Sequence, residues 1–434
     1  MNKSKGHSPR FYLTLTLLSL IGQIAWVVEN MYLNVFLYKM FRASAADISR
    51  MVAASAVAAT LTTVLIGALS DRIGKRKLFI CGGYILWGIS ILGFTLLRLD
   101  IISALFPAAV SAASLGVSLV IALDCIMTFF GSSANDAAFN AWLTDSTDRT
   151  NRGTAEGINA MMPLVAILAV FGGFMAFDLD APQSWTYIFA IIGGIVTAVG
   201  VLGCFLLREP PIRPSQQGYL RTVVHGFLPS TVKKNGRLYL TLIGFILFNT
   251  SIQIFMPYLI LYYEVSLGMS NYVFVMAPAI LLASVATALW GKVYDKRGFS
   301  LTVWVSLGVL AAGYLLLFFV RATPLVFVGS LLMMCGYLCG MAVFGARIRD
   351  LTPGGAAGMF QGVRIFSQVL VPGVLGPWIG KLVLANAETI LNSDGTESFV
   401  PDANIFAAAL VPIVLLCCLL AFTLRSRRDK TPTT

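Results

Sequence analysis

The sequence contains few charged residues and almost no histidine. Asp, Glu, Lys and Arg make up 12% of the 434 residues, and there are two histidines. About 25% charged residues is typical of soluble domains. A water-soluble chain of this length could not cover its surface with so few charges. The composition therefore excludes an ordinary soluble enzyme and a disordered protein. The apolar side chains, 57% of the chain, predict a polytopic helical membrane protein.

Motifs for metal binding, phosphate binding and hydrolysis are also missing. The seven cysteines lie inside apolar runs, and neither His7 nor His225 stands at metal-ligand spacing from them. The chain has no Gly-Lys-Ser/Thr phosphate loop and no Ser/His/Asp or His-Glu-x-x-His pattern. We therefore expect no enzyme activity, no metal, no other cofactor and no ATP hydrolysis.

Twelve apolar runs approach or exceed the roughly 20 residues that cross a bilayer. They are residues 11–36, 51–69, 78–97, 118–143, 155–177, 185–207, 238–263, 272–290, 301–320, 325–346, 359–384 and 405–424. Residues 101–116 are apolar but too short to span, so we expect a surface segment or an extended helix end. The sequence thus predicts an all-α membrane protein with two six-helix bundles. The bundles are residues 1–207 and 238–434, joined by a linker at 208–237.

Lys and Arg indicate how the chain is oriented. With the N-terminus in the cytoplasm, 24 of the 31 basic residues fall on the cytoplasmic side and six on the outer side. This asymmetry is typical of an even number of spans with both termini cytoplasmic. It explains the net charge of +11 without nucleic acid. We expect a multi-pass protein of the cell (inner) membrane, without a cleaved signal peptide, and a mobile outer loop at 385–404.

One loop pattern occurs in both halves of the chain. Gly67, Asp71 and Gly74 follow the second run, and Gly291, Asp295 and Gly298 follow the eighth with the same spacing. A second pair of similar loops, 145–153 and 350–355, follows the fourth and tenth runs. Parallel repeats of six helices are typical of two-bundle transporters that bind their solute near the bilayer midplane.

The span count and these loops resemble the major facilitator superfamily over nearly the whole chain. The resemblance implies two bundles that rock around a central cavity lined by helices 1, 4, 7 and 10, with helices 5, 8 and 11 beside them. It also implies that the loop after helix 2 stabilises the outward-facing state, unless its basic residues serve topology alone. The predicted conformational gate comprises Gly67, Asp71, Arg72, Arg76, Asp295 and Arg297.

A narrower resemblance concerns residues 135–157. They are similar to the helix 4–5 region of glycoside–pentoside–hexuronide:cation symporters of the melibiose permease type. There an Asp followed three residues later by an aromatic residue binds sugar, and Asp136 and Phe139 match. The acids that these symporters carry on helix 2 for Na⁺ are missing from residues 51–69, and Gln23 stands in place of an acid on helix 1. Proton coupling is therefore preferred over Na⁺ coupling.

Polar residues inside the apolar runs are functional candidates because burying them is costly. The predicted solute-binding residues are Gln23, Trp26, Asn30, Asp136, Asn140, Asn249, Gln253, Gln361, Arg364 and Gln368. Glu29 is the first candidate for proton coupling and Asp136 the second, the alternative being structural hydrogen bonds or ion pairs. Arg364 requires an anion, which the solute, Asp136 or Glu29 would supply. Asp124 is expected to be an outer gate or a solvated group.

These features together predict a secondary active transporter that moves a small polar organic solute by alternating access. The favoured solute is a sugar or glycoside, and the expected coupling ion is a proton. We expect the protein to be a monomer in the lipid bilayer. The alternative is a drug or metabolite efflux antiporter, because Gly373, Gly376, Pro377 and Gly380 resemble the Gly/Pro motif of antiporters. A non-transporting membrane receptor is disfavoured, since the chain has no soluble receptor-like domain.

Overall fold

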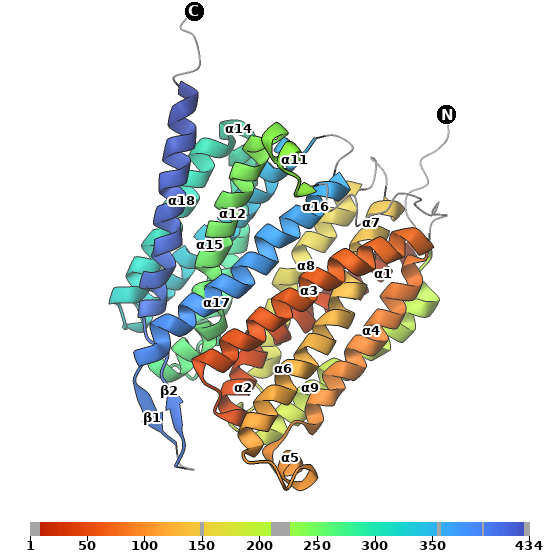
Figure 1. Ribbon diagram of the computed structural model, residues 1–434, viewed down its shortest axis with the longest axis vertical. Helices are drawn as coiled ribbons and strands as arrows, with labels where there is room; N and C mark the ends of the chain where they lie inside the picture. Colours follow the sequence, from red (N-terminus) through yellow and green to blue (C-terminus); the bar gives the residue numbers. More distant parts are fainter. Residues whose placement is uncertain (1–8, 148–151, 210–225, 354–356, 393–394, 429–434) are drawn as a thin grey trace, which may run out of the picture. The chain divides into compact units, whose positions relative to one another are not determined.

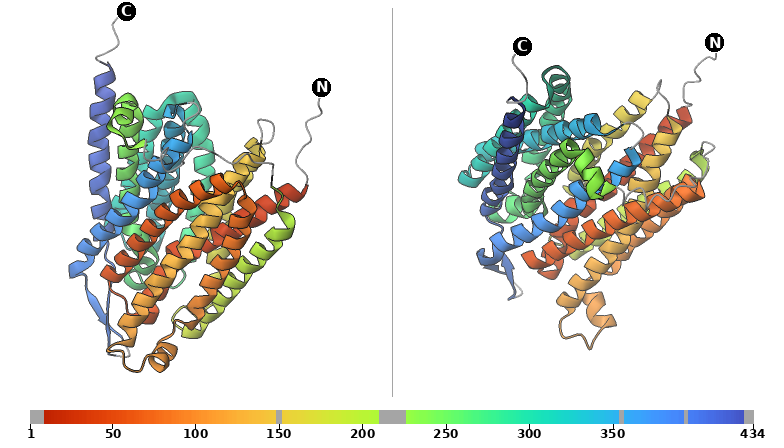
Figure 2. Two further views of the ribbon diagram at one scale, coloured as in Figure 1. Left: turned by 45° about the vertical axis from the view of Figure 1, so that its right-hand side comes forward. Right: turned by 45° about the horizontal axis from the view of Figure 1, so that its top comes forward.

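The computed structural model describes residues 9–147, 152–209, 226–353, 357–392 and 395–428. The chain folds into two compact units, unit 1 (Met1–Thr222) and unit 2 (Val223–Thr434). Within unit 1 the helices pack side by side along their length, as α4 and α9 do in Figure 1. Within unit 2, α18 (dark blue) runs beside α12 (green), as Figure 2 shows.

Unit 1 is helical throughout its described part. Its α-helices are α1 (Pro9–Val27), α2 (Leu33–Phe41), α3 (Ala45–Ile73), α4 (Arg76–Gly93), α5 (Leu99–Leu105), α6 (Ala112–Gly131), α7 (Asn140–Ser146), α8 (Arg152–Phe174) and α9 (Pro182–Leu206). Two π-helical turns join consecutive helices, η1 (Val28–Tyr32) between α1 and α2 and η3 (Ser132–Phe139) between α6 and α7. A 3₁₀ turn, η2 (Phe94–Leu96), follows α4.

Unit 2 contains long helices and one small hairpin. Its α-helices are α11 (Pro229–Lys234), α12 (Gly236–Phe255), α13 (Leu259–Leu261), α14 (Val273–Phe319), α15 (Thr323–Leu351), α16 (Ala357–Ile365), α17 (Val371–Val383) and α18 (Asn404–Arg428). The remaining turns are η4 (Met256–Tyr258), η5 (Tyr262–Ser266), η6 (Phe366–Leu370) and η7 (Leu384–Asn386). The strands are β1 (Thr389–Leu391) and β2 (Glu397–Phe399).

Eleven helical segments in the described part of the chain are long and apolar enough to span a membrane. The predicted count of twelve is therefore not confirmed. The difference arises at α14, whose 47 residues contain two of the predicted runs. A continuous helix of that length would extend about 70 Å, more than twice the roughly 30 Å of a hydrocarbon core. Gly298, with a φ of 75° and a ψ of −179°, interrupts the helical backbone inside α14.

Two glycines of the repeated loop pattern adopt left-handed backbone conformations. Gly74 ends α3 with a φ of 69°, and Gly298 breaks α14 with a φ of 75°. Glycine reaches positive φ without the steric cost that a Cβ imposes. The pattern Asp-x-x-Gly therefore has the same role in both halves: it places a glycine where a long helix must end or turn.

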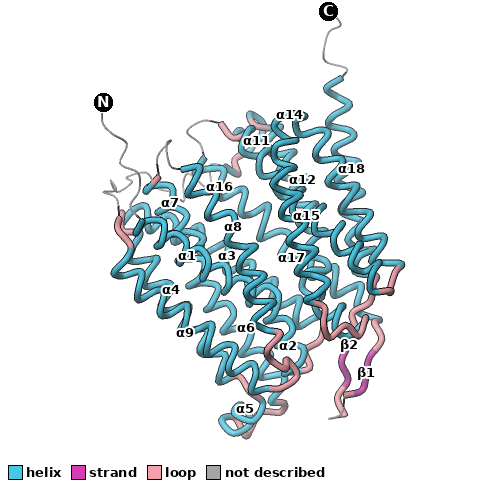
Figure 3. Tube along the Cα trace, turned by 180° about the vertical axis from the view of Figure 1, so that it is seen from behind, coloured by secondary structure: helices cyan, strands magenta, loops and turns pink. Residues whose placement is uncertain are grey.

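Two connecting segments about which the sequence makes predictions have a defined structure. Residues 101–116 do not span, as expected, because only the seven-residue helix α5 precedes an irregular stretch before α6. The loop at 385–404 contains the antiparallel hairpin β1–β2, in which Thr389 pairs with Phe399 (Figure 3). Its expected mobility and outer position stay predictions. The fold is thus helical apart from this hairpin in the described residues.

Glycines allow the closest approaches between helices. A methyl group added at Gly88 of α4 would lie 2.5 Å from the backbone nitrogen of Thr197 and 2.6 Å from the carbonyl oxygen of Gly193, both on α9. In unit 2, a methyl group at Gly336 of α15 would lie 2.5 Å from the backbone of Leu310 on α14. Small residues at such crossings let backbones pack by van der Waals contact, which is the main attraction between helices in lipid.

This packing predicts opposite effects for two glycines of the same helix. Gly88→Ala should lower the thermal unfolding midpoint of the purified protein by several degrees, because the backbone atoms it meets cannot move aside and overpacking costs about 1–3 kcal/mol. Gly82→Ala is the matched control, since nothing lies within 4 Å of its added methyl group. Alanine favours helix, so Gly82→Ala should be neutral or stabilising. Equal midpoints for the two variants would contradict the assigned α4–α9 contact.

Candidate functional site

The buried acid of helix 1 is held by two hydroxyl groups. Glu29, in η1, is 7% exposed. Its Oε1 accepts hydrogen bonds from Ser55 Oγ on α3 at 2.9 Å and from Thr128 Oγ1 on α6 at 2.8 Å. The two hydroxyl oxygens are themselves 2.8 Å apart. The other carboxylate oxygen, Oε2, is buried without a hydrogen-bond partner in the described structure.

A second acid, Asp124, belongs to the same cluster. It lies one helical turn before Thr128 on α6, and residues four apart share a helix face. Its exposed fraction is 1%, and its electrostatic neighbours include Glu29 and the hydrogen-bonding Ser55 hydroxyl. Its Oδ1 is buried and has no hydrogen-bond partner among the described residues. The expectation of a solvated Asp124 is therefore wrong, since neighbouring helices cover it. The role of outer gate stays a prediction.

An amide network joins three helices next to this cluster. Asn135, in η3, accepts a hydrogen bond from Trp26 Nε1 at 3.3 Å and donates one to Tyr84 OH at 2.8 Å. Tyr84, on α4, donates in turn to the carbonyl oxygen of Leu18 at 2.6 Å. The Trp26 ring also packs on Trp87 with the centroids 5.0 Å apart. Asn135 thus has a structural role, and it orients the half-buried indole of Trp26.

Asp136 faces a different set of groups from its neighbour Asn135. Its side chain is half-buried and accepts a hydrogen bond from Ser132 Oγ at 3.0 Å. Asn140 is exposed and donates to the carbonyl oxygens of Asn135 at 3.2 Å and Asp136 at 3.1 Å. Asp136 is also an electrostatic neighbour of Glu29. Three acids of unit 1 therefore lie in one region of the unit.

The other polar side chains of the first predicted span, which comprises α1, η1 and α2, differ in exposure. Gln23 is half-buried and Asn30 is exposed. Asn30 donates a hydrogen bond to the carbonyl oxygen of Trp26 at 2.8 Å. Asn34 is buried and donates to the carbonyl oxygen of Asn30 at 3.0 Å. Asn30 and Asn34 therefore bond back to their own helix, which leaves the Asn30 carboxamide oxygen available at the surface of unit 1.

Two predicted solute-binding residues on α12, the seventh predicted span, are engaged in packing. The Asn249 amide is buried and donates to the carbonyl oxygen of Phe245 at 2.8 Å. Gln253 is half-buried and lies against α17, where a methyl group at Gly376 would come within 2.4 Å of its Cβ. A methyl group at Gly380 would lie 2.6 Å from the Ile254 carbonyl oxygen. Gly376 and Gly380, two glycines of the stretch that resembles the antiporter motif, thus let α17 lie close to α12.

The predicted solute-binding residues of the eleventh predicted span lie on α16 and in η6, and they are only partly described. Arg364 and Gln368 are half-buried, whereas the side chain of Gln361 lies outside the described residues. Asp136 and Arg364 belong to different units, so their predicted pairing stays a prediction.

Four π-helical turns occur in the described structure, and each contains a polar or acidic side chain. Glu29 lies in η1, Asn135 and Asp136 lie in η3, Glu264 lies in η5 and Gln368 lies in η6. Such widened turns are frequent at functional sites, because the extra residue redirects side chains and frees backbone groups. Hydrophobic periodicity does not reveal them, so they could not be predicted from the sequence.

Among the described side chains of the predicted gate, Arg76 makes a buried charged contact. The side chain of Arg76, at the start of α4, is 6% exposed and lies 3.2 Å from Asp145 Oδ2 on α7. It also donates to Ser70 Oγ at the end of α3 at 2.6 Å. Arg72 is exposed, and the side chain of Asp71 lies outside the described residues. Ser70 further bonds the carbonyl oxygen of Gly67 at 3.0 Å. Arg76 therefore connects the ends of three helices.

The second copy of the loop is arranged differently. Asp295 and Arg297 are exposed, so the structure does not bring them into a buried contact. Instead Tyr294 OH donates to Asp350 Oδ2 at 2.5 Å. Asp350 and Asp145 lie in the last turns of α15 and α7, in corresponding parts of the two halves, but one meets a tyrosine and the other an arginine. The sequence repeat did not reveal this difference, because Tyr294 lies outside the shared pattern.

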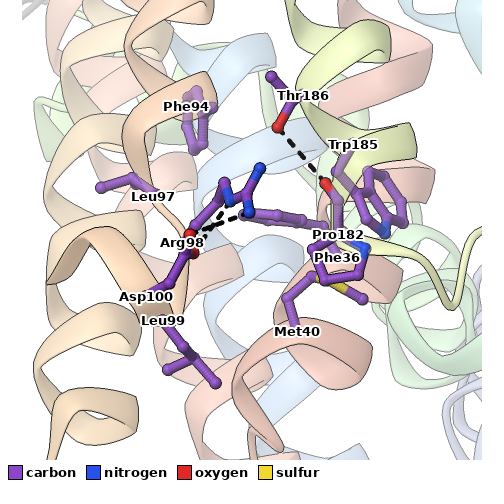
Figure 4. A pocket seen from close by; sticks show the side chains of 10 residues that line it. All are labelled: Phe36, Met40, Phe94, Leu97, Arg98, Leu99, Asp100, Pro182, Trp185 and Thr186. Atoms are coloured by element: carbon purple, nitrogen blue, oxygen red, sulfur yellow. Dashed lines mark hydrogen bonds and ion pairs between the residues drawn. The ribbon is translucent and has the colours of Figure 1, made fainter. Parts of the chain in front are cut away.

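A cavity of about 350 Å³ lies elsewhere in unit 1. Figure 4 shows the ten side chains that line it, with Arg98 bonded to Asp100 and Thr186 bonded to the carbonyl oxygen of Pro182. Phe36, Phe94 and Trp185 supply apolar walls, as do Met40, Leu97 and Leu99. None of the predicted solute-binding residues lines this cavity.

Comparisons with known proteins support the fold. The sequence model of the Major Facilitator Superfamily matches residues 15–377. No curated protein sequence matches the chain. One similar solved structure is a bacterial homolog of the human lysosomal transporter Spinster in an inward-facing and unoccupied conformation. It is 17% identical in sequence, with a TM-score of 0.69, and the alignment covers 99% of this chain and 100% of that one. The nucleoside transporter NupG is 15% identical with a TM-score of 0.68, covering 94% and 98%. The melibiose permease branch is not confirmed.

The Arg76 contact predicts a specific loss of stability. Arg76→Met should lower the free energy of unfolding by about 1.5–3 kcal/mol, the usual contribution of a hydrogen bond to a charged group. Arg72→Met is the matched control, because Arg72 is exposed and its loss should cost little. Thermal unfolding of both variants and of Asp145→Asn measures the effect. Strict additivity in the Arg76→Met/Asp145→Asn double variant would contradict a direct contact.

Proposed function

Because the chain belongs to the Major Facilitator Superfamily of membrane transporters, we propose that it moves a small polar organic solute by proton-coupled alternating access. A sugar or glycoside is the favoured solute class. The proposal includes twelve spans, because α14 is counted as two helices on either side of Gly298. The protein would be a monomer in the cell membrane with both termini in the cytoplasm. It also includes six-helix bundles at 1–207 and 238–434 and a cytoplasmic linker at 208–237.

The proposed proton coupling rests on the buried cluster of Glu29, Ser55 and Thr128. A carboxyl group inside a membrane protein is costly unless it is paired or can take up a proton. No ion pair joins Glu29 to a Lys or Arg within the described part of the chain. Its only direct partners there are the hydroxyl groups of Ser55 and Thr128. A proton is therefore the simplest cation that could neutralise Glu29 during a transport cycle.

The proposed solute contacts in unit 1 combine a ring with polar groups. Trp26 is half-buried, and its indole is oriented by Asn135 and Trp87. Asp136 is half-buried, while Asn30 and Asn140 are exposed. A flat aromatic ring and several hydrogen-bonding side chains suit a ligand that has both apolar faces and hydroxyl groups, such as a sugar. In unit 2, the proposed solute contacts are Gln253, Arg364 and Gln368.

The fold is shared with a nucleoside transporter, and a nucleoside is itself a glycoside. Nucleosides therefore belong among the solutes to be tested. The efflux alternative has less support, because Gly376 and Gly380, two of the three glycines that suggested it, serve close packing between α17 and α12. The hydrogen-bonding groups near Trp26 also suit a polar solute better than a lipophilic one.

Solute class can be tested by ligand-induced thermal stabilisation of the purified protein. Sugars, glycosides, nucleosides, organic anions and lipophilic cations would each be added to the wild-type chain and to Asp136→Asn. A bound solute at 100 times its Kd stabilises the folded state by about 2.7 kcal/mol. We expect stabilisation by a sugar or glycoside that is lost in Asp136→Asn and kept in Asp100→Asn, an exposed control. Stabilisation by lipophilic cations alone, equal in all variants, would contradict the proposal.

Proton coupling can be tested with the first solute found. Proteoliposomes with an imposed proton gradient should accumulate that solute above its external concentration. Glu29→Gln should abolish this accumulation while retaining exchange of labelled for unlabelled solute, because the amide cannot take up or release a proton. Asp100→Asn again serves as the control. Gradient-driven accumulation that persists in Glu29→Gln would exclude Glu29 as the coupling group.

A further inference from the structure

We propose that Glu29 and Asp124 form one site that holds a single shared proton, with the Ser55 hydroxyl turning between the two acids. The use of this site for transport rests on the proposed proton coupling, but the site itself is argued from unit 1 alone. Asp124 is not among the residues predicted for coupling from the sequence.

The two acids are brought together by three helical segments. Glu29 comes from η1, Ser55 from α3, and Asp124 and Thr128 from successive turns of α6. Exposed fractions are 7% for Glu29, 1% for Asp124 and 0% for Thr128. Both acids are therefore buried, and a buried carboxyl group is costly unless it has polar partners.

Each acid has one oxygen without a donor. Ser55 and Thr128 both donate to Glu29 Oε1, whereas Glu29 Oε2 and Asp124 Oδ1 are buried and have no hydrogen-bond partner in the described structure. Two ionised carboxylates here would add charge repulsion to this loss of donors. One proton bound by the pair removes one negative charge and supplies one O–H donor. Like-charged acids that share a site take up protons in coupled steps.

The groups that surround the pair do not offer a competing countercharge. Asp136 is an electrostatic neighbour of Glu29, and Cys125 is a neighbour of both acids. Neither supplies a positive charge. No ion pair connects Glu29, Asp124 or Asp136 to a basic side chain among the residues that the structure describes. Nor does any group of three His, Cys, Asp or Glu residues there form a metal site.

The Ser55 hydroxyl gives the pair two arrangements. A hydroxyl has one hydrogen and can donate to one acceptor at a time. Ser55 Oγ and Thr128 Oγ1 lie within hydrogen-bond distance of Glu29 Oε1, and Ser55 is also a hydrogen-bonding neighbour of Asp124. With the proton on Asp124, both hydroxyls can donate to the ionised Glu29. When the proton moves to Glu29, the ionised Asp124 becomes the better acceptor, and Ser55 turns toward it. The position of one proton would thus change a hydrogen bond between η1, which carries Glu29, and α3, which carries Ser55.

The experiment is a proton titration of the purified protein without any solute. Infrared difference spectra recorded as a function of pH would follow the carbonyl band of protonated carboxyl groups in the wild type, Glu29→Gln, Asp124→Asn and the double variant. A shared site predicts two wild-type steps, whereas each single variant has one. The single-variant midpoints should differ from those of the wild type by at least about tenfold in proton concentration. The double variant should lack these steps.

Independent acids give a different result. The wild-type curve would then equal the sum of the two single-variant curves, and this outcome would overturn the proposal. Ser55→Ala keeps both acids and provides a second test if an acid variant does not fold. Because it removes a donor from ionised Glu29, it should displace the wild-type midpoints, whereas Ser49→Ala should not. Unchanged midpoints in Ser55→Ala would also count against the proposal.

A metal cation is distinguished by repeating the titration in NaCl and in choline chloride. The shared-proton site predicts the same curves in both salts. A Na⁺-dependent displacement that requires both acids would assign a metal-cation site instead and would overturn the proposal. Because no solute is present, failure here leaves the proposed solute class intact. Conversely, a failed solute screen would leave the two-step titration standing.

Discussion

Polar groups inside the membrane-spanning helices must find their hydrogen-bond partners within the protein, because lipid offers none. Most hydroxyl and amide side chains meet this requirement locally, by donating to a carbonyl oxygen one turn back on their own helix. Thr14, Thr63 and Asn249 do so at 2.8 Å. Such residues are satisfied without a partner helix, so they reveal little about function. The informative side chains are the few that bond across helices or retain an unsatisfied buried atom.

The cross-helix bonds differ in kind between the two units. In unit 1 they involve carboxylate and amide groups, as in Glu29 with Ser55 and Thr128. In the described part of unit 2 they chiefly join hydroxyl groups to one another or to carbonyl oxygens, as in Tyr314 with Ser251 and Tyr263 with Ser330. Hydroxyl pairs satisfy each other without charge, whereas carboxyl groups can also gain or lose a proton. The two halves thus share a helical scaffold, while the cluster of buried acids around Glu29 lies in unit 1.

The same divergence appears at the loops. Gly74 and Gly298 keep a left-handed backbone in both halves, yet Arg76 meets Asp145 in one half and Tyr294 meets Asp350 in the other. Both contacts involve a carboxylate acceptor, but only the first also has a charged donor, whose planar guanidinium fixes the geometry. Helix ends in unit 1 are therefore held together by a bond that involves charge on both sides, whereas in unit 2 only the acceptor is charged.

The sequence by itself determined the membrane class, the approximate positions of the spans, the loop repeat and the family, because these depend on hydrophobicity along the chain and on short local patterns. It also identified Glu29 as a buried acid. It could not determine that Asp124 lies against Glu29 and Ser55, that Asn135 is committed to Trp26 and Tyr84, or that the glycines of α17 serve contact with α12. Those facts depend on which faces of distant helices meet and on π-helical turns that shift the side-chain register. Only the tertiary structure decides them, since periodicity along one helix carries no information about its neighbours.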